Sequence, residues 1–544
     1  MEYHYMNNPN SREWWLLAII FAFFGVLYIY GLTHSGLWFD ESIEYYYSKY
    51  LTGPVPVNPV DQSGNNMYER ICITYQPPLY NILMYFWLLL FDSEVGFRLA
   101  GVIVTFIGSL GFYYAIRRLA GYIWGILGLC FYLSTAAVFY SALECSEYNL
   151  MLCMECWMLY YYVVCVQSPS IQVSYHALIG FFLFAALSVY SQYGAVFFAV
   201  ALFISLCMVY IKSKNFVSIR RLFIMGACTI IIAIIPLLFY FIQVQMGNQG
   251  SIVVDHHPVF VGHFLGGVPY SLFKSFYEQV MWIFYSSLIW GWTTESIMRV
   301  AVSIVFISTL VSIFLRSRIS VLIPSVIASI VCYILFFVMS ACSLYAYNSW
   351  DGQLGCYNII EHTRYVLFIV PLFVFTFFIG IISLSKYISQ RGHKRIAEGY
   401  IFIVMAVFIA NALWGGVKGK IKSDGREVTY AWLNQKDDVH KVVVQEWLAG
   451  TFMFYYQHSD ACNDVMSDKI ILTRQDMRIP EKIEPHLRSL GVFDLPAFYF
   501  VGSKSAIGMN NGEGIQIISD LFTNNGYKVK TIWKGTSELL FISK

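Results

Sequence analysis

The sequence predicts an α-helical polytopic membrane protein that ends in a small extracytoplasmic α/β domain. Of its 544 residues, 58% are hydrophobic and only 12% are charged, whereas soluble globular proteins carry about 25% charged residues. The apolar residues form continuous runs that are long enough to cross a hydrocarbon core of about 30 Å. The last part of the chain returns to an ordinary soluble composition. A formal net charge of +2 indicates no nucleic-acid partner.

Eleven apolar segments have the length and composition of membrane helices. We expect these helices at residues 14–31, 95–116, 121–140, 149–166, 176–193, 194–211, 222–243, 296–315, 320–341, 364–384 and 399–415. The first segment is long and lacks a small-residue cleavage site, so we expect it to remain as a helix and not to be removed as a signal peptide.

The basic residues set the orientation, because cytoplasmic loops carry an excess of Lys and Arg. With the N-terminus in the cytoplasm, the outer segments hold Lys49, Arg70, Arg98, Lys274, Arg299 and Arg364. The inner segments then hold about twice as many, namely Arg12, Arg117, Arg118, Lys212, Lys214, Arg220, Arg221, Arg316, Arg318, Lys386, Arg391, Lys394 and Arg395. We therefore expect a multi-pass protein of the inner (plasma) membrane with a cytoplasmic N-terminus.

This topology leaves two long outer loops, at residues 32–94 and 244–294. The apolar run Leu79–Phe91 in the first loop is too short for a span, so we expect a helix that lies in the outer interface. The second loop carries several acidic and histidine side chains whose spacing does not match a zinc site, and we predict no metal there. These side chains are Asp255, His256, His257 and His263.

We divide the chain into a membrane domain at 1–416 and a soluble domain at 417–544. Short apolar runs in the second part have the pattern of buried strands, at Val442–Val444, Ile470–Thr473, Phe498–Val501 and Leu539–Ile542. Helical patterns alternate with them, which indicates an α/β domain. An odd number of membrane helices places this domain outside. It has no glycine-rich phosphate loop, so we assign it no chemistry.

Two neighbouring carboxylates follow the first membrane helix. Asp40 and Glu41 lie just outside the membrane, and Glu44 follows Asp40 by one helical turn. A carboxylate close to low-dielectric lipid has a raised pKa and becomes a better base. Equally, acids in the first turn of a helix cap its N-terminus and favour the positive end of its dipole. Both interpretations stay open for this motif.

A guanidinium is predicted at the outer start of the tenth membrane helix, at Arg364 followed by Tyr365. Guanidinium groups bind phosphate through two parallel hydrogen bonds. The alternative is an interfacial anchor whose side chain extends to the headgroups.

Three further polar turns fall at outer helix ends. Gln76 precedes two prolines that force an extended entry into the interfacial helix. Glu144 and Tyr148 lie in the turn after the third membrane helix, and Gln192 and Tyr193 follow the fifth. Each turn taken alone is explained as an ordinary helix end or as part of a belt of interfacial aromatic residues. Their common location on the outer side favours a shared substrate site.

Taken in order, these motifs resemble the GT-C glycosyltransferases. They are most similar to the bacterial branch related to protein O-mannosyltransferases and the lipid A aminoarabinose transferase, which includes galacturonosyltransferase-like proteins of the rhizobial lipopolysaccharide core. The resemblance covers roughly residues 14–415. It is carried by Leu37–Glu41, Gln76–Tyr80, Ser93–Leu99, Glu144–Tyr148, Tyr190–Tyr193, Arg364–Phe368 and Pro371.

The resemblance implies a GT-C fold and an enzyme that moves a hexose or pentose from a polyprenyl-phosphate donor to a hydroxyl of a cell-envelope glycan, lipid or protein, with inversion. Asp40 matches the catalytic acid of the family, and Glu41 orients the acceptor or Asp40. Arg364 and Tyr365 match the residues that hold the donor phosphate. The remaining polar residues line the substrate site, namely Glu44, Gln76, Glu144, Tyr148, Gln192 and Tyr193.

The sequence departs from the family at two positions. Ser146 stands where many relatives have Arg, and Gln192 stands where many have His. Gln192 can hydrogen-bond but cannot carry a proton charge. No cofactor is expected with certainty; a divalent cation held by Asp40 and Glu41 is left open. A transporter or flippase, and an inactive binding protein of the same fold, are the alternatives to an enzyme.

Overall fold

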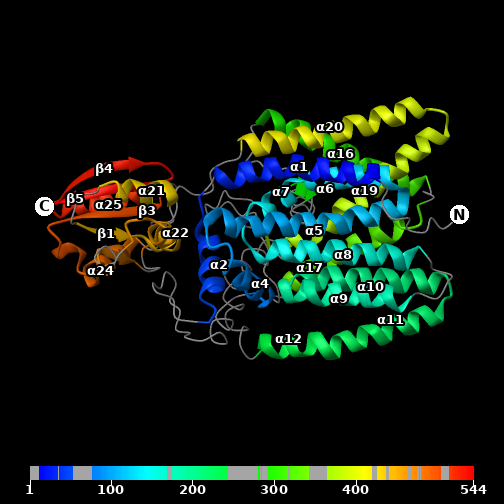
Figure 1. Ribbon diagram of the computed structural model, residues 1–544, viewed down its shortest axis with the longest axis horizontal. Coiled ribbons are helices and arrows are strands. Elements are labelled where there is room, and N and C mark those ends of the chain that lie inside the picture. Colours follow the sequence, from blue (N-terminus) through cyan, green and yellow to red (C-terminus); the bar gives the residue numbers. More distant parts are fainter. Residues whose placement is uncertain are drawn as a thin grey trace.

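The computed structural model describes residues 11–34, 36–52, 76–167, 174–242, 280–281, 283–284, 292–315, 319–341, 364–418, 425–435, 440–462, 468–473, 477, 480–503 and 514–544. They form a bundle of long helices with a five-stranded sheet beyond one end of it (Figure 1). The elements of the membrane part are α1 (Ser11–Thr33), α2 (Phe39–Lys49), α4 (Leu79–Leu88), α5 (Glu94–Ala120), α6 (Tyr122–Leu133), α7 (Ala136–Ala142), α8 (Glu147–Val166), α9 (Tyr175–Ser191), α10 (Ala195–Lys212), α11 (Phe216–Thr229), η1 (Ile230–Ile234), α12 (Ile235–Tyr240), α16 (Trp292–Phe314), α17 (Leu322–Ala341), η4 (Arg364–Ile369), α19 (Val370–Gln390) and α20 (Lys394–Lys418).

Within the described residues, nine helices are long and apolar enough to cross a membrane. The predicted polytopic membrane protein is thus confirmed. Two of the eleven expected spans differ from plain long helices. The span expected at 121–140 is the pair α6 and α7, which is bent by 69°, and α9 has only 17 residues.

Hydroxyl groups explain the bend between α6 and α7. The Ser134 hydroxyl donates to the Cys130 carbonyl, and the Thr135 hydroxyl donates to the Tyr132 carbonyl at 2.8 Å. Side-chain hydroxyls that bond back to the preceding turn compete with the helix ladder and bend helices. The backbone of Thr135 is accordingly extended, at φ −72° and ψ 139°.

The start of the first helix and the sheet lie at opposite ends of the bundle (Figure 1). Helix α1 begins at the end farthest from the sheet (Figure 1). At that end Arg117 of α5 pairs with the buried carboxylate of Glu13, which also accepts a hydrogen bond from Tyr113. The arrangement matches an odd number of membrane crossings; that the α1 end faces the cytoplasm stays a prediction from the basic residues.

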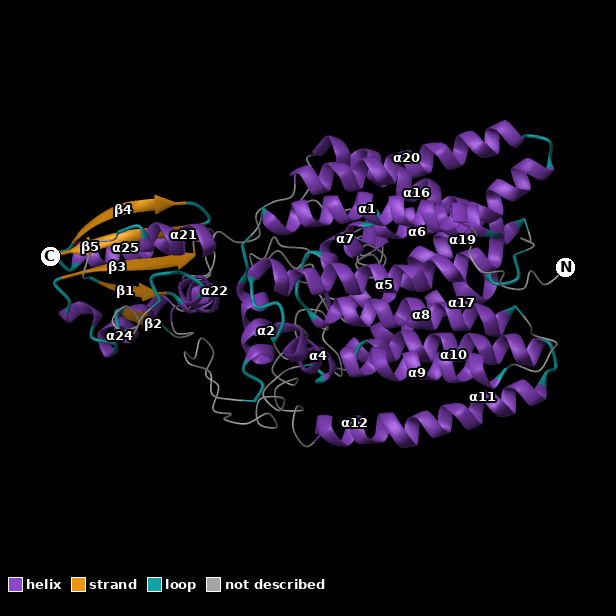
Figure 2. Cartoon of the chain, viewed as in Figure 1, coloured by secondary structure: helices purple, strands orange, loops and turns teal. Residues whose placement is uncertain are grey.

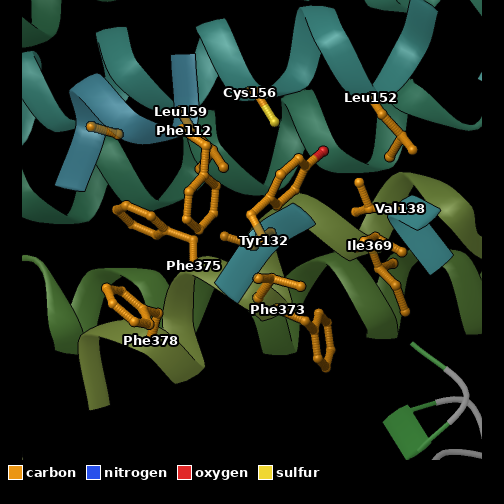
Figure 3. Packing of buried hydrophobic residues seen from close by; sticks show 14 of the residues in the cluster. Phe112, Tyr132, Val138, Leu152, Cys156, Leu159, Ile369, Phe373, Phe375 and Phe378 are labelled. Atoms are coloured by element: carbon orange, nitrogen blue, oxygen red, sulfur yellow. The ribbon is translucent and has the colours of Figure 1, made fainter. Parts of the chain in front are cut away.

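The core of the bundle lies between α5, α6, α8 and α19. Figure 3 shows aromatic rings from three of these helices meeting there, and the rings of Phe112 and Tyr132 stack at a centroid distance of 4.7 Å. A Cβ atom added at Gly108 of α5 would lie 2.6 Å from the Cα atom of Cys153 in α8. Small residues thus let these two helices approach closely, as is usual between membrane helices.

Two short helices occupy the bundle end that is nearest the sheet. Helix α2 runs across the ends of the long helices (Figure 2), and α4 packs against α2 and α5. On α4 the side chains of Leu83 and Phe86 are 47% and 60% exposed. An exposed apolar face on a helix too short to span fits the interfacial helix that the sequence predicts at Leu79–Phe91.

The soluble part is a mixed sheet covered by helices. Its strands follow the order β2-β1-β3-β5-β4, in which β1 pairs parallel with β2 and β3, while β5 pairs antiparallel with β3 and β4. The predicted α/β domain is confirmed, and each of the four strands expected from apolar runs is present. The elements are α21 (Gly425–Leu433), β1 (Lys441–Val444), α22 (Glu446–Gln457), β2 (Ile470–Leu472), α24 (Pro480–Ser489), η6 (Val492–Asp494), β3 (Ala497–Ser503), α25 (Gly514–Asn524), β4 (Lys528–Lys534) and β5 (Ser537–Ser543).

Strand β4 was not expected from the sequence. It is the edge strand of the sheet and carries exposed lysines at Lys528 and Lys534. Charged edge strands prevent pairing with other chains, and the same charges remove the apolar run by which a buried strand is recognised.

Candidate active site

A buried ion pair fixes the start of α2 to the membrane bundle. The Arg98 Nη2 atom of α5 lies 2.6 Å from the Glu41 Oε2 atom, and Arg98 Nε lies 2.9 Å from Glu41 Oε1. Arg98 is 1% exposed and Glu41 is fully buried. A pair with two parallel hydrogen bonds is the strong geometry for guanidinium and carboxylate.

Glu41 also caps the helix on which it lies. Its Oε2 atom accepts a hydrogen bond from the Trp38 backbone N–H at 3.2 Å, as the third helical residue does in a capping box. The helix-capping interpretation of this motif is therefore confirmed for Glu41. Arg98 and this N–H group lie on the two oxygens of Glu41 and fix the start of α2; that Glu41 orients Asp40 or the acceptor stays a prediction.

The turn between α7 and α8 also contacts the Glu41 carboxylate. The Cys145 backbone N–H donates to Glu41 Oε1 at 3.2 Å, and the Cys145 thiol donates to the Phe97 carbonyl at 3.0 Å. This contact brings Glu144 and Tyr148, the two residues expected from this turn, next to α2. Tyr148 is buried and Glu144 is half-buried.

A second carboxylate of α2 faces α4. The Glu44 Oε2 atom accepts a hydrogen bond from Asn81 Nδ2 at 2.9 Å. Desolvation by burial raises the pKa of Glu44 to about 7, against the smaller opposite effect of the Asn81 hydrogen bond. Burial also raises the pKa of the neighbouring Tyr80 phenol, and the charges of Cys145, Glu44 and Glu147 add to that shift. Burial therefore disfavours the charged form of both the Glu44 carboxyl and the Tyr80 phenol.

Asp40 lies in the first turn of α2, between the buried Glu41 and the aromatic residue Phe39. Its side chain is half-buried. The Phe39 ring stacks in parallel on the Trp447 ring of α22, with centroids 4.5 Å apart and 5° between the planes. Asp40 thus lies where the membrane bundle meets the soluble domain.

Three more expected site residues lie at this end of the bundle. Gln76 is half-buried just ahead of α4. Gln192 is buried in the turn between α9 and α10, where its side chain accepts the Gly194 N–H. The Tyr193 ring beside it packs on Phe241 at 5.1 Å. Helix α4 also packs against α9, which brings this turn near the rest of the group.

The expected phosphate-binding pair lies in η4, which leads into α19. The η4 segment packs against α8, α10 and α17, and the Phe368 ring contacts Phe197 of α10 at 5.4 Å. The side chains of Arg364 and Tyr365 lie outside the described part of the structure, and so do Tyr75 and most of the loop 244–294.

The two carboxylates that the sequence offers to a divalent cation differ in their surroundings. Glu41 is already paired with Arg98, which supplies a positive charge. Within the described residues, no group of three or more His, Cys, Asp or Glu side chains could hold a metal ion, and a cation at Asp40 stays a prediction.

Two residues of this group were not singled out from the sequence. From the sequence, Arg98 is a basic residue at an outer helix end and part of the Ser93–Leu99 motif without a role of its own, and Asn81 carries no assignment. The sequence does carry a signal for Arg98, because a charged arginine within an apolar helix costs free energy unless it pairs with an acidic side chain. Asn81 has no comparable signal, since one amide in a short apolar helix is common.

Solved structures show the same fold over nearly the whole chain. Two structures of ArnT from Cupriavidus metallidurans, one bound to undecaprenyl phosphate and one in the apo state, each align over 98% of this chain and 98% of their own length. The TM-score is 0.56 for both, at 12% and 11% identity. An oligosaccharyltransferase from Archaeoglobus fulgidus aligns over 93% of this chain and 69% of its own, with a TM-score of 0.49 and 10% identity. No family model and no curated protein sequence matches.

Proposed function

We propose that this chain, which has the GT-C fold, is a membrane glycosyltransferase that moves a sugar from a polyprenyl-phosphate donor to a hydroxyl acceptor at the outer face of the inner membrane. The fold is shared with ArnT, one structure of which holds undecaprenyl phosphate. The proposal is that this chain uses a donor of the same kind.

The observation that carries the proposal is the placement of Asp40. This carboxylate is half-buried in the first turn of a helix that the Arg98–Glu41 pair holds across the end of the bundle. A general base must be kept at one position relative to the proton that it takes. The helix dipole adds a second effect, because the first turn of a helix favours the ionised carboxylate.

In the proposed reaction the acceptor hydroxyl oxygen attacks the anomeric carbon of the sugar. The bond between this carbon and the phosphate oxygen breaks, and the hydroxyl proton passes to Asp40. The new glycosidic bond forms on the face opposite the leaving group, so the anomeric configuration inverts. Polyprenyl phosphate leaves with the bonding electrons and with a larger negative charge than it had as a diester.

We assign the leaving phosphate to Arg364, with Tyr365 beside it. A guanidinium at the start of η4 stabilises the charge that grows on the phosphate in the transition state. The lipid chain of the donor lies in the bilayer, so a cation at a helix end is at the depth of the phosphate.

We assign the walls of the substrate site to the polar residues around α2. Glu44 and Tyr148 lie on the side of α4 and α8, and a carboxyl with a pKa of about 7 can both donate and accept hydrogen bonds near neutral pH. The remaining members of this proposed wall are Gln76, Glu144, Gln192 and Tyr193.

The test is a transfer assay on the full-length protein in lipid nanodiscs. Undecaprenyl phosphate carrying single pentoses or hexoses serves as the donor panel, and envelope lipids, glycans and peptides serve as acceptors. We expect transfer with release of undecaprenyl phosphate, and a loss of about 10² to 10⁴-fold in the Asp40→Asn variant. The exposed Asp520 of α25 gives the matched control, Asp520→Asn.

Equal transfer by wild type and Asp40→Asn removes Asp40 from the role of base. Binding of the donor without turnover on any acceptor favours an inactive binding protein of this fold. Movement of the intact donor lipid from one leaflet to the other in proteoliposomes, again without turnover, favours a flippase.

A further inference from the structure

Helix α22 of the soluble domain packs along α2 and along the segment just before it (Figure 1). Besides the Phe39–Trp447 stack, the Tyr46 hydroxyl donates to Gln457 Oε1 at 2.9 Å. The Phe454 ring meets the Tyr45 ring edge-on at 4.8 Å. The soluble domain is therefore attached to the helix that carries Asp40, and not only to the end of α20.

One contact of α22 reaches the backbone that leads into α2. The Leu37 backbone N–H donates to the Tyr455 hydroxyl oxygen at 2.7 Å, between residues that are 418 positions apart in the chain. Leu37 is fully buried and Tyr455 is 3% exposed. Burial raises the pKa of the Tyr455 phenol, and the charge of Glu94 raises it further, so the hydroxyl stays neutral.

Three different elements hold two successive peptide groups in this segment, namely those between residues 36 and 37 and between residues 37 and 38. Arg98 Nη2 of α5 donates to the Gly36 carbonyl at 2.8 Å, Tyr455 of α22 accepts from Leu37, and Glu41 of α2 accepts from Trp38 at 3.2 Å. Asp40 follows two residues later. A buried backbone N–H that loses its partner carries a substantial penalty, so removal of any of these groups allows the segment to move.

We propose that Tyr455 is a positioning residue for the transfer reaction, acting through the Leu37 backbone to hold Asp40 at the reacting position. This inference rests on the proposed function. It gives the soluble domain a positioning role in the chemistry. Misplacement of a catalytic group by about 1 Å lowers rates by about 10²-fold, so one buried hydrogen bond is enough to matter.

The test is the Tyr455→Phe variant of the full-length protein, which keeps the ring and removes the hydroxyl. The matched control is Tyr46→Phe, which removes another α2–α22 hydrogen bond two turns along α2. Assays use the undecaprenyl-phosphate sugars that wild type turns over. We expect kcat to fall about 10- to 100-fold in Tyr455→Phe, with the donor KM within about twofold of wild type, and kcat in Tyr46→Phe to stay within about threefold.

Hydrogen–deuterium exchange of the peptide that covers residues 36–38 supplies a second measurement. We expect faster exchange there in Tyr455→Phe, with the strands of the soluble domain protected as in wild type. Faster exchange with unchanged kcat overturns the positioning role. An equal loss of kcat in Tyr46→Phe also overturns it, because Tyr455 would then act only as one anchor of the domain.

The exchange measurement separates this inference from the proposed function. If wild type transfers no sugar from any donor of the panel, the proposed function fails and the positioning role fails with it, whereas exchange at Leu37 still reports whether the contact forms. If wild type is active and Tyr455→Phe changes neither kcat nor exchange, only the inference about Tyr455 fails.

Discussion

Arg98 and Glu41 form a fully buried ion pair across 57 positions of the sequence, with Nη2 and Oε2 2.6 Å apart. Neither charge is exposed to solvent, since Arg98 is 1% exposed and Glu41 is fully buried. Arg98 makes further contacts: Nη1 lies 3.2 Å from the Leu32 carbonyl and 3.4 Å from Glu94 Oε1, and Nη2 lies 2.8 Å from the Gly36 carbonyl. The guanidinium thereby joins the end of α1, the loop after it and α2 to a single side chain of α5.

Breaking this pair from one side leaves the other charge buried. We expect Arg98→Leu and Glu41→Leu each to lower the free energy of unfolding by about 3–5 kcal/mol, measured by denaturant unfolding in detergent micelles with circular dichroism. The exposed pair of Arg488 and Glu484 on α24 is the control, and its loss should cost about 0.3–0.5 kcal/mol. Similar small losses for both pairs would contradict a structural role of the buried pair.

Arg364→Ala tests the donor phosphate site. Because the guanidinium is assigned to the phosphate and not to the acceptor, we expect the Kd for undecaprenyl phosphate to rise about tenfold or more, while the acceptor KM changes little. Binding is measured by microscale thermophoresis in nanodiscs. Arg391→Ala, beyond the other end of α19, changes the same charge far from the site and should leave both values unchanged. An unchanged donor Kd in Arg364→Ala rejects the assignment.

Glu44 should make stability and activity depend on pH near neutrality. Its pKa is about 7 in the folded protein against 4.5 ordinarily, so the unfolded chain loses the proton first as pH rises. Stability therefore falls between about pH 4.5 and 7, by a few kcal/mol at most after allowance for partial exposure. We expect Glu44→Gln to remove this fall in melting temperature and the inflection near pH 7 in the transfer rate.

The exposed Glu481 of α24 provides the comparison for that experiment. Glu481→Gln should leave the pH dependence of wild type intact. A wild-type melting temperature that is flat between pH 4.5 and 7, or a Glu44→Gln variant with the same slope as wild type, would show that Glu44 is ionised in the folded protein at neutral pH.

A second pH effect is expected where α22 meets the loop after α4. Asp92 accepts a hydrogen bond from Tyr45 at 2.8 Å, pairs with Lys49, and lies 3.8 Å from His458 Nε2. The nearby Asp92 carboxylate raises the pKa of His458 above 6.5 and outweighs the opposite effect of burial. Burial by itself raises the pKa of Asp92, but the neighbouring His458, Lys49 and Tyr45 outweigh it and hold that pKa below its ordinary value.

The pKa shifts of His458 and Asp92 together define the pH range in which their contact stabilises the folded protein. The His458 contribution is complete below about pH 6.5 and is lost as pH rises through its raised pKa. The Asp92 contribution is complete above about pH 4 and is lost as pH falls through its lowered pKa. We expect the thermal stability of the soluble domain to be greatest between about pH 4 and 6.5, and His458→Gln to lose the decline above that window. His176→Gln, an exposed change on α9, should keep it.

Much of the membrane architecture follows from composition and period alone. Runs of apolar residues mark the long helices, because a helix satisfies all its backbone hydrogen bonds within its own segment in lipid. Four of the five described strands were marked by short buried runs. Two elements depart from these predictions for local reasons. The Ser134 and Thr135 hydroxyls bend the span formed by α6 and α7, and the lysines of β4 interrupt the apolar run by which a strand is recognised.

The sequence by itself determined that the chain crosses the membrane many times, which end carries the soluble domain, and that Asp40 lies among polar residues at helix ends. Only the tertiary structure decided which of those residues meet. The Arg98–Glu41 pair and the Tyr455–Leu37 hydrogen bond join positions 57 and 418 residues apart, and each exists because a buried charge or N–H group must find a partner in a packed interior. That requirement can be read from one residue, but the identity of the partner depends on how the helices pack.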